Sequence, residues 1–260
     1  MGVNPELLRS LKELPSGKKV YFASDFHLGV PNGDESLTRE KKIVRWLEHI
    51  SNDAAAIFLL GDIFDFWFEY KTTVPKGFIR FQGKLAELRE RGIPIILFTG
   101  NHDLWMKDYF PQELDIPIIK NPITIQVNEK KLFIGHGDGL GSGDTFYKVV
   151  KAIFTNPICQ WFFRWLHPDI GVRLAKYWSK KSRIDSADEK FEGEGERLWK
   201  YCEIVNQQAH HDYYVFGHRH LALELPVADN STYFNLGEWV TQCNYLEFDG
   251  KQAILKTFKD

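Results

Sequence analysis

The chain has 260 residues, of which 43% are hydrophobic and 26% are charged, and its formal net charge is −2. The composition is typical of a globular protein, and the length suits one large α/β domain or one domain with an insertion; the net charge gives no sign of a nucleic-acid partner. The sequence contains no run of eighteen apolar residues, so no membrane-spanning helix is predicted.

The first part of the chain alternates predicted helices with short apolar strands. Helices are expected over residues 5–14, 37–50 and 78–91, and strands begin at Val20, Ile57 and Ile95. Residues 29–35 are expected to form a polar loop, and the aromatic run 66–70 a second loop, used either for packing or as a wall for substrate. This rhythm predicts parallel strands joined by right-handed crossovers.

Beyond Asp115 the pattern changes to that of hairpins. Strands are expected at 116–119, 123–127, 132–134, 213–216, 232–236, 245–248 and 253–258. The whole pattern predicts an α/β fold, a four-layer α/β/β/α sandwich of two mixed sheets, in a single domain over residues 1–260.

Residues 140–200, here called the lid segment, are predicted to form a helical insertion within that domain. From Thr145 to Arg183 this segment has eight Lys or Arg residues against one acid, a net charge of +7, and nine aromatic residues. Pro157 and Pro168 divide it into three helical pieces. A basic, apolar helical cap suggests an anionic amphiphilic substrate or contact with an anionic membrane surface. The alternative is an ordinary helical hairpin with a solvated basic face.

Five predicted strands end in residues that can bind metal ions. The carboxyl ends of strands in open α/β sheets are where ligands bind, so these side chains should meet at one rim. They are Asp25, His27, Asp62, Asn101, His136, His218 and His220. Oxygen and imidazole ligands without thiolates suit Mn, Fe or Zn, and seven ligands exceed what one ion needs. We therefore predict two divalent ions, with Asp62 as the bridging ligand.

Asp103 and Asp138 lie next to these residues in the sequence. They could be further ligands, but we expect them to orient His102 or His136 through a ring nitrogen. The three cysteines are far apart and lack CxxC spacing, and the polar N-terminus lacks an apolar signal segment. These features predict reduced, buried thiols and a cytoplasmic location.

The order of these residues resembles that of the calcineurin-like metallophosphoesterases. Within that superfamily, His136 to Leu140 with Asp144, the lid segment, and Asn235 to Trp239 are similar to the UDP-2,3-diacylglucosamine hydrolases of lipid A synthesis. The resemblance implies that one ion is held by Asp25, His27, Asp62 and His220, and the other by Asp62, Asn101, His136 and His218.

The resemblance also implies which residues contact the substrate. Asp144 should position its sugar-nucleotide portion, with Asn101, Ser182 and Arg183 as further contacts. Some of these hydrolases carry arginine where this chain has His102, which can protonate a leaving oxygen or stabilise phosphoryl charge. Asp103 is expected to assist it in catalysis.

The expected chemistry is attack on phosphorus by a hydroxide shared between the two ions. The predicted substrate is a lipid-linked nucleotide sugar, UDP-2,3-diacylglucosamine, cleaved to UMP and 2,3-diacylglucosamine 1-phosphate. Mn²⁺ is the expected metal, with Fe or Zn as alternatives. The protein is expected to associate peripherally with the inner face of the bacterial inner membrane. The alternatives are a phosphodiesterase or phosphatase acting on soluble nucleotides and a non-catalytic metal-binding scaffold.

Overall fold

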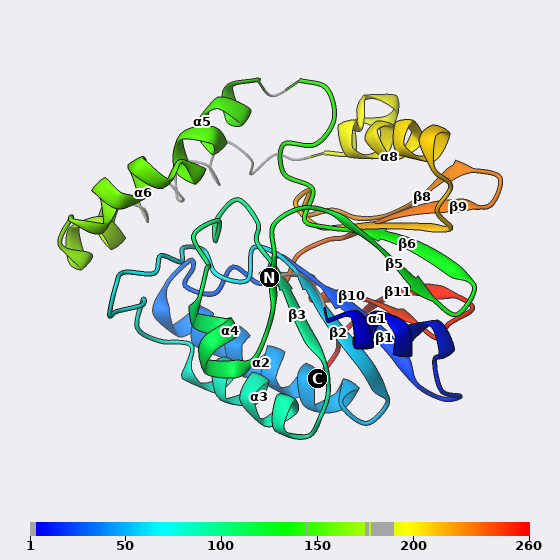
Figure 1. Cartoon of the computed structure of the whole chain (residues 1–260), viewed down its shortest axis with the longest axis horizontal. Coiled ribbons are helices and arrows are strands. Elements are labelled where there is room, and N and C mark those ends of the chain that lie inside the picture. Colours follow the sequence, from blue (N-terminus) through cyan, green and yellow to red (C-terminus); the bar gives the residue numbers. More distant parts are fainter. Residues whose placement is uncertain (1–3, 144, 175–176, 178–189) are drawn as a thin grey trace.

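Two β-sheets pack face to face, and helices cover the outer face of each (Figure 1). The structure is a computed structural model that describes residues 4–143, 145–174, 177 and 190–260. The predicted four-layer arrangement of two mixed sheets is confirmed.

The first sheet has the strand order β11-β10-β1-β2-β3-β4. Strands β1 to β4 pair in parallel, whereas β10 runs antiparallel to both β1 and β11. The strands are β1 (Lys19–Ala23), β2 (Ala54–Leu60), β3 (Ile95–Phe98), β4 (Ile118–Ile119), β10 (Asn244–Phe248) and β11 (Ala253–Thr257).

The second sheet has the order β5-β6-β7-β9-β8. Its three central strands are parallel, and an antiparallel strand lies at each edge. The strands are β5 (Ile123–Val127), β6 (Lys130–Ile134), β7 (Tyr213–Phe216), β8 (Ala222–Ala228) and β9 (Ser231–Leu236).

One hydrophobic core lies between the two sheets, and a second, larger one lies between the first sheet and its helices. In β1, Val20 and Phe22 face the second sheet, whereas Tyr21 and Ala23 face the helices. Side chains of a strand alternate between its two faces, so a strand buried on both sides must be apolar throughout. This explains the unbroken apolar runs of β1, β2 and β3.

Helices α2 (Gly33–Ile50), α3 (Ile79–Glu90) and α4 (Tyr109–Leu114) cover the first sheet, and α8 (Arg197–Gln208) covers the second. A short helix α1 (Pro5–Ser10) and the turn η1 (Leu11–Glu13) precede β1. Among the described helices, none combines the length and apolar character needed to cross a bilayer.

Several predicted boundaries differ from the structure. Residues 33–35, expected in a polar loop, lie in the first turn of α2, because the Asn32 side chain accepts a hydrogen bond from the N–H of Glu35 at 3.0 Å and caps the helix. Strand β8 and helices α4 and α8 were not predicted. Cys202 and Cys243 are buried as expected, but Cys159 is exposed, since it lies on the outer part of the lid segment.

In the lid segment, the structure describes α5 (Thr145–Thr155), α6 (Pro157–Arg164), a helical stretch over 168–174 and the turn η2 (Gly193–Gly195). Phe163 packs on Phe68 and Trp105, with ring centroids 4.7 Å apart in each pair. The Trp105 indole N–H also donates to the carbonyl oxygen of Phe154 at 2.5 Å. At least part of the aromatic run 66–70 therefore serves to seat the lid helices.

Candidate metal centre

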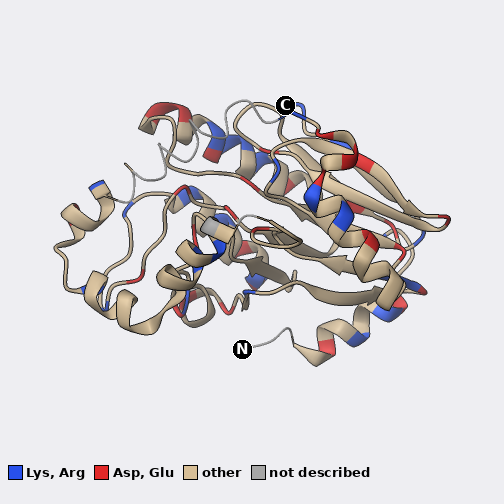
Figure 2. Ribbon diagram, turned by 90° about the horizontal axis from the view of Figure 1, so that it is seen from above, with Lys and Arg blue, Asp and Glu red and all other residues tan. Residues whose placement is uncertain are grey.

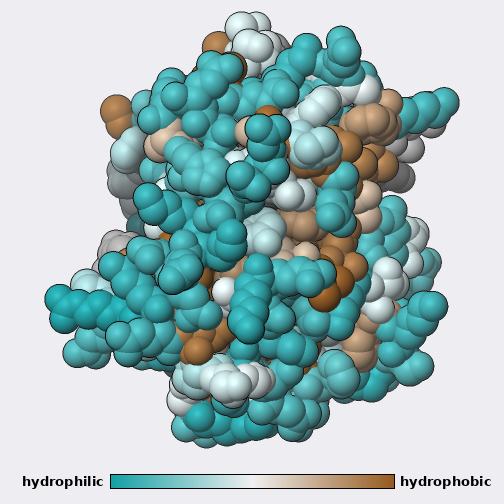
Figure 3. Space-filling model, turned by 90° about the vertical axis from the view of Figure 1, so that its right-hand side faces the viewer, coloured by the Kyte–Doolittle hydropathy of each residue, from teal (hydrophilic) through white to brown (hydrophobic). Residues whose placement is uncertain are grey.

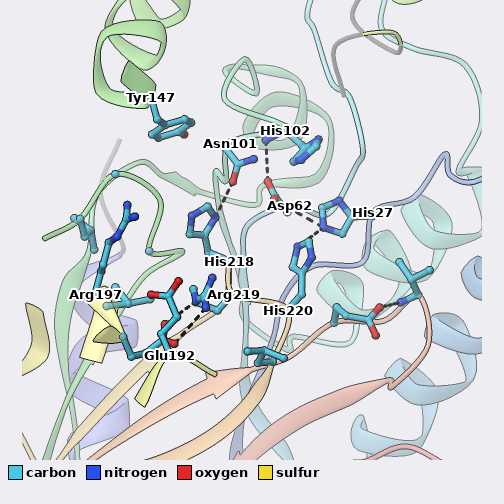
Figure 4. A pocket seen from close by; sticks show the side chains of 18 of the residues that line it. His27, Asp62, Asn101, His102, Tyr147, Glu192, Arg197, His218, Arg219 and His220 are labelled. Atoms are coloured by element: carbon cyan, nitrogen blue, oxygen red, sulfur yellow. Dashed lines mark hydrogen bonds and ion pairs between the residues drawn. The ribbon is translucent and has the colours of Figure 1, made fainter. Parts of the chain in front are cut away.

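All seven predicted ligands lie together at the ends of parallel strands from both sheets. Asp25, Asp62 and Asn101 follow β1, β2 and β3, while His136 and His218 follow β6 and β7. Backbone hydrogen bonds tie these ligand loops to one another: the N–H of Asp25 donates to the Gly61 carbonyl at 3.0 Å, and that of His27 to the Asp62 carbonyl at 2.9 Å. Figure 4 shows His27, His220 and Asp62 on one side and Asn101 with His218 on the other.

The first group consists of Asp25, His27, Asp62 and His220, whose ligand atoms all lie within 4.8 Å of one another. Nε2 of His27 is 3.0 Å from Nε2 of His220, and Oδ1 of Asp25 is 3.3 Å from the same His220 atom. Converging carboxylate oxygens and imidazole nitrogens are the donor set of Mn, Fe or Zn sites. This group could hold one cation.

The second group consists of Asp62, Asn101, His136 and His218. Oδ1 of Asn101 is 3.2 Å from Nε2 of His136 and 3.0 Å from Nδ1 of His218. Nδ1 of His136 lies 2.8 Å from the Leu60 carbonyl oxygen. That contact fixes the ring so that Nε2 points at Asp62, as an outer hydrogen bond does for many metal-binding histidines.

Asp62 lies between the two groups. Its Oδ2 is 3.4 Å from Nε2 of His136 and 3.9 Å from Nε2 of His27. This oxygen is buried and, within the described residues, has no hydrogen-bond partner. A buried carboxylate oxygen without a donor is costly, and a cation on each side would satisfy it. The residues present therefore fit a pair of divalent ions bridged by Asp62.

Unusual backbone conformations aim these side chains. Asp25, His27, Asp62, His218 and His220 all have positive φ, at 55°, 44°, 52°, 72° and 51°. Non-glycine residues rarely adopt this left-handed region, and such strain persists where the surroundings hold it, often at functional sites. Gly100 permits the close approach of the loops after β2 and β3, because a Cβ at this position would lie 2.6 Å from the Asp62 backbone nitrogen.

The local charges suit cation binding. Burial opposes ionisation of Asp62, but His136 and His102 outweigh it and hold its pKa well below the usual value. Burial, aided by the charge of His136, lowers the pKa of His218 to about 4. Burial also opposes protonation of His136, yet Asp62 and Asp25 raise its pKa to about 10. Among the histidines whose pKa is strongly shifted, only the pKa of His136 is raised, so His136 would have to lose a proton when it binds a metal ion.

His102 lies at the edge of the centre and contacts Asp65. Its Nδ1 is 3.1 Å from the Asp65 carbonyl oxygen and 3.7 Å from Oδ1 of the same residue. Its ring meets that of His27 edge-on, with centroids 4.9 Å apart. The sequence analysis missed Asp65, although its position three residues after Asp62, at the same strand end, was a usable signal.

Asp103 and Asp138 were expected to contact a ring nitrogen of His102 or His136, but their hydrogen bonds and ion pairs go to other groups. The Asp103 carboxylate accepts the backbone N–H groups of Gly100 at 2.7 Å and Ile63 at 2.8 Å, so it braces two ligand loops. Burial, together with the charge of Asp62, raises its pKa to about 7. Asp138 accepts the Tyr147 hydroxyl at 2.6 Å and pairs with Lys151 at 2.6 Å, which ties α5 to the loop after β6.

The centre opens into a pocket of about 820 Å³. Beyond the metal-binding residues and His102, the pocket is lined by Tyr147, Arg197, Arg219 and the 238–242 turn, among others. The predicted substrate contacts Asp144, Ser182 and Arg183 lie outside the described residues.

Comparison with known proteins identifies the class. The calcineurin-like phosphoesterase model matches residues 18–222, so the chain belongs to this family. A UDP-2,3-diacylglucosamine hydrolase of Porphyromonas gingivalis (strain ATCC BAA-308 / W83) is 36% identical over 257 residues, covering 93% of this chain and 98% of the relative. A protein of the same name from Yersinia pestis bv. Antiqua (strain Angola) is 24% identical, covering 91% and 98%. Both confirm the resemblance found in the sequence.

Among solved structures, Yfce, a phosphoesterase from E. coli, covers 88% of this chain and 87% of its own, with 16% identity and a TM-score of 0.42. That similarity is too low to support a further conclusion.

Proposed function

We propose that this protein is a metal-dependent hydrolase that cleaves the pyrophosphate bond of UDP-2,3-diacylglucosamine, giving UMP and 2,3-diacylglucosamine 1-phosphate. The observation that carries the chemistry is the convergence of seven candidate ligands on one open pocket. The substrate is suggested by the 36% identity, over nearly the full length of both chains, to a hydrolase of that name.

In this proposal, Asp25, His27, Asp62 and His220 hold one divalent ion, and Asp62, Asn101, His136 and His218 hold the other. Two such ions, with Mn²⁺ as the proposed metal, would lower the pKa of a water molecule and stabilise charge on the phosphoryl oxygens.

The protein's own contribution to the reaction centres on His102. Its ring lines the pocket next to the metal-binding residues, where it can donate a proton to the leaving oxygen or a hydrogen bond to the phosphoryl group. Asp65 holds the ring by its contacts with Nδ1. Asp103 is a positioning residue in this scheme, because its carboxylate contacts the backbone of the ligand loops.

We further propose that α6 brings the protein to the membrane where a diacylated substrate resides. Apolar side chains of α6 and of its C-terminal cap residue Trp165 are unusually exposed: Trp161 by 54%, Phe162 by 64% and Trp165 by 75%. Acidic residues are absent from α5 and α6, so that red is missing from both in Figure 2. The far side of the molecule, seen in Figure 3, is mainly hydrophilic. An exposed apolar face without acids suits peripheral binding to an anionic surface.

Incubation of the purified protein with UDP-2,3-diacylglucosamine and Mn²⁺, followed by mass spectrometry, tests the proposal. Release of UMP that disappears with a chelator is the expected result. Hydrolysis of bis(p-nitrophenyl) phosphate without UMP release would point to a soluble phosphoester substrate. A protein that binds two metals but hydrolyses neither compound would be a scaffold.

A further inference from the structure

The pocket extends past the metal centre along the first turn of α8. Glu192, Arg197 and Leu198 form this part of its lining, here called the α8 wall. Figure 4 shows Arg197 on the same side of the pocket as His218 and Tyr147, away from His27 and His220. A substrate bound at the metals therefore has a charged wall beside it that the metal ligands do not provide.

Two arginines line the pocket, and their surroundings differ. The Arg219 guanidinium donates through Nε and Nη2 to the two carboxylate oxygens of Glu196, at 2.6 and 3.2 Å. Glu196 is fully buried, so the charge of Arg219 is compensated within the protein. Arg197 is exposed, and within the described part of the chain its guanidinium makes no hydrogen bond and no ion pair, including with Glu192 on the same wall.

The fold holds Arg197 in this place. Because Arg197 directly follows Glu196, the Glu196–Arg219 pair anchors the start of α8 to the loop that carries His218 and His220. The Arg197 side chain lies along Gly143, where an added Cβ would be 3.6 Å from Nη1. Gly143 has a φ of +95°, a left-handed conformation that glycine adopts without strain, so it allows the loop to turn next to the guanidinium.

We propose that Arg197 binds the second phosphate of a pyrophosphate substrate, next to the phosphate that is attacked at the metal centre. The planar guanidinium offers paired N–H donors that match phosphate oxygens, and it has no competing partner among the described residues. Arg197 is then a specificity-determining residue that favours pyrophosphates over monophosphates. This inference rests on the proposed function, which supplies a substrate with two adjacent phosphates.

Calorimetric titration of the Mn²⁺-loaded protein with UMP and with non-hydrolysable α,β-methylene-UDP tests the inference without turnover. The wild type is expected to prefer the diphosphate analogue, and Arg197→Ala to reduce that preference by about tenfold or more. Arg197→Lys should retain part of it, because lysine keeps the charge but not the fork of donors. Lys200→Ala is the matched control: it removes an exposed positive charge one turn further along α8, outside the pocket.

Equal binding of the two nucleotides by the wild type, or an unchanged preference in Arg197→Ala, would overturn the inference. An equal loss of the preference in Lys200→Ala would show that any positive charge on α8 has this effect, which would also overturn the inference. Turnover separates this result from the proposed function. If UDP-2,3-diacylglucosamine is hydrolysed but Arg197 has no effect on the preference, only the inference is wrong. If the preference depends on Arg197 but no UMP is released, only the substrate assignment is wrong.

Discussion

Replacing Asp65 with asparagine should slow the reaction without removing metal, because Asp65 acts through His102. Its Oδ1 lies 3.7 Å from Nδ1 of His102, and the side chain is only 4% exposed. The hydrogen bond to Nδ1 comes from the Asp65 backbone carbonyl, which the substitution keeps, so only the carboxylate charge is lost. Two unit charges about 4 Å apart interact by about 1–4 kcal/mol, from bulk water to an effective dielectric constant of about 20, which corresponds to about 5–1000-fold. Asparagine keeps the size of the side chain, so we expect kcat to fall by roughly that factor while both ions stay bound.

A double-mutant cycle between Asp65 and His102 tests whether Asp65 acts through the His102 ring. His102→Ala should lower kcat by roughly 10²–10⁴ and retain both metals. If Asp65 works only through that ring, Asp65→Asn should add nothing in the His102→Ala background. The assay is Mn²⁺-dependent hydrolysis of bis(p-nitrophenyl) phosphate, with elemental analysis of each variant. Additive losses would show that Asp65 acts independently. Loss of an ion would instead indicate that His27, Asp65 and His102, whose ligand atoms lie within 4.8 Å of one another, bind metal.

Three further outcomes are expected. Asp62→Ala should lose both ions and all activity, because Oδ2 of Asp62 lies between the two groups of candidate ligands. If elemental analysis still finds two ions in this variant, Asp62 is not the bridging ligand. Trp161, Phe162 and Trp165 are all exposed, so changing them together to Ser should leave the melting temperature and the hydrolysis of a small phosphodiester unchanged. The KM for the diacylated substrate should rise sharply. An equal loss of activity towards both substrates would show that α6 has a structural role. Mn²⁺ binding near neutral pH should release about one proton, because the pKa of His136 is raised to about 10 and its imidazolium must lose a proton to bind metal. Calorimetry in buffers of different ionisation enthalpy measures the number of protons released. The affinity for Mn²⁺ should also rise with pH.

The convergence of the candidate ligands could be predicted because each follows a buried apolar strand. Parallel pairing of β1 with β2 and β2 with β3 brings the residues after these strands to one edge, so sequence order was enough to place Asp25, Asp62 and Asn101 together. The partner of His102 could not be found in this way. Three carboxylates lie close to the ligands in sequence, and only the path of the loops decides that Asp65, and not Asp103, reaches the ring.

Elements outside this strand pattern were harder to predict. Strand β8 lies at a sheet edge, contains Pro226 and is not fully buried at any position, so it lacks the apolar run that marks the central strands. Helix α8 has its buried residues, Leu198 and Cys202, on one face, but its start falls inside the predicted lid segment. The expected boundary at residue 200 therefore cuts through a helix that packs on the second sheet.

The left-handed conformations of the candidate ligands are held by contacts within the protein. Strained conformations persist only when other contacts outweigh them, and here those contacts include hydrogen bonds between buried side chains and backbone groups. Asp103 accepts N–H groups from the loops after β2 and β3, and the Asn235 side chain donates to the Gly217 carbonyl just before His218. Asp25 itself accepts the His218 N–H at 3.1 Å, which joins the two sheets at the rim. Because these bonds need no cation, we expect the candidate ligands to be prearranged, so that metal binding requires little rearrangement.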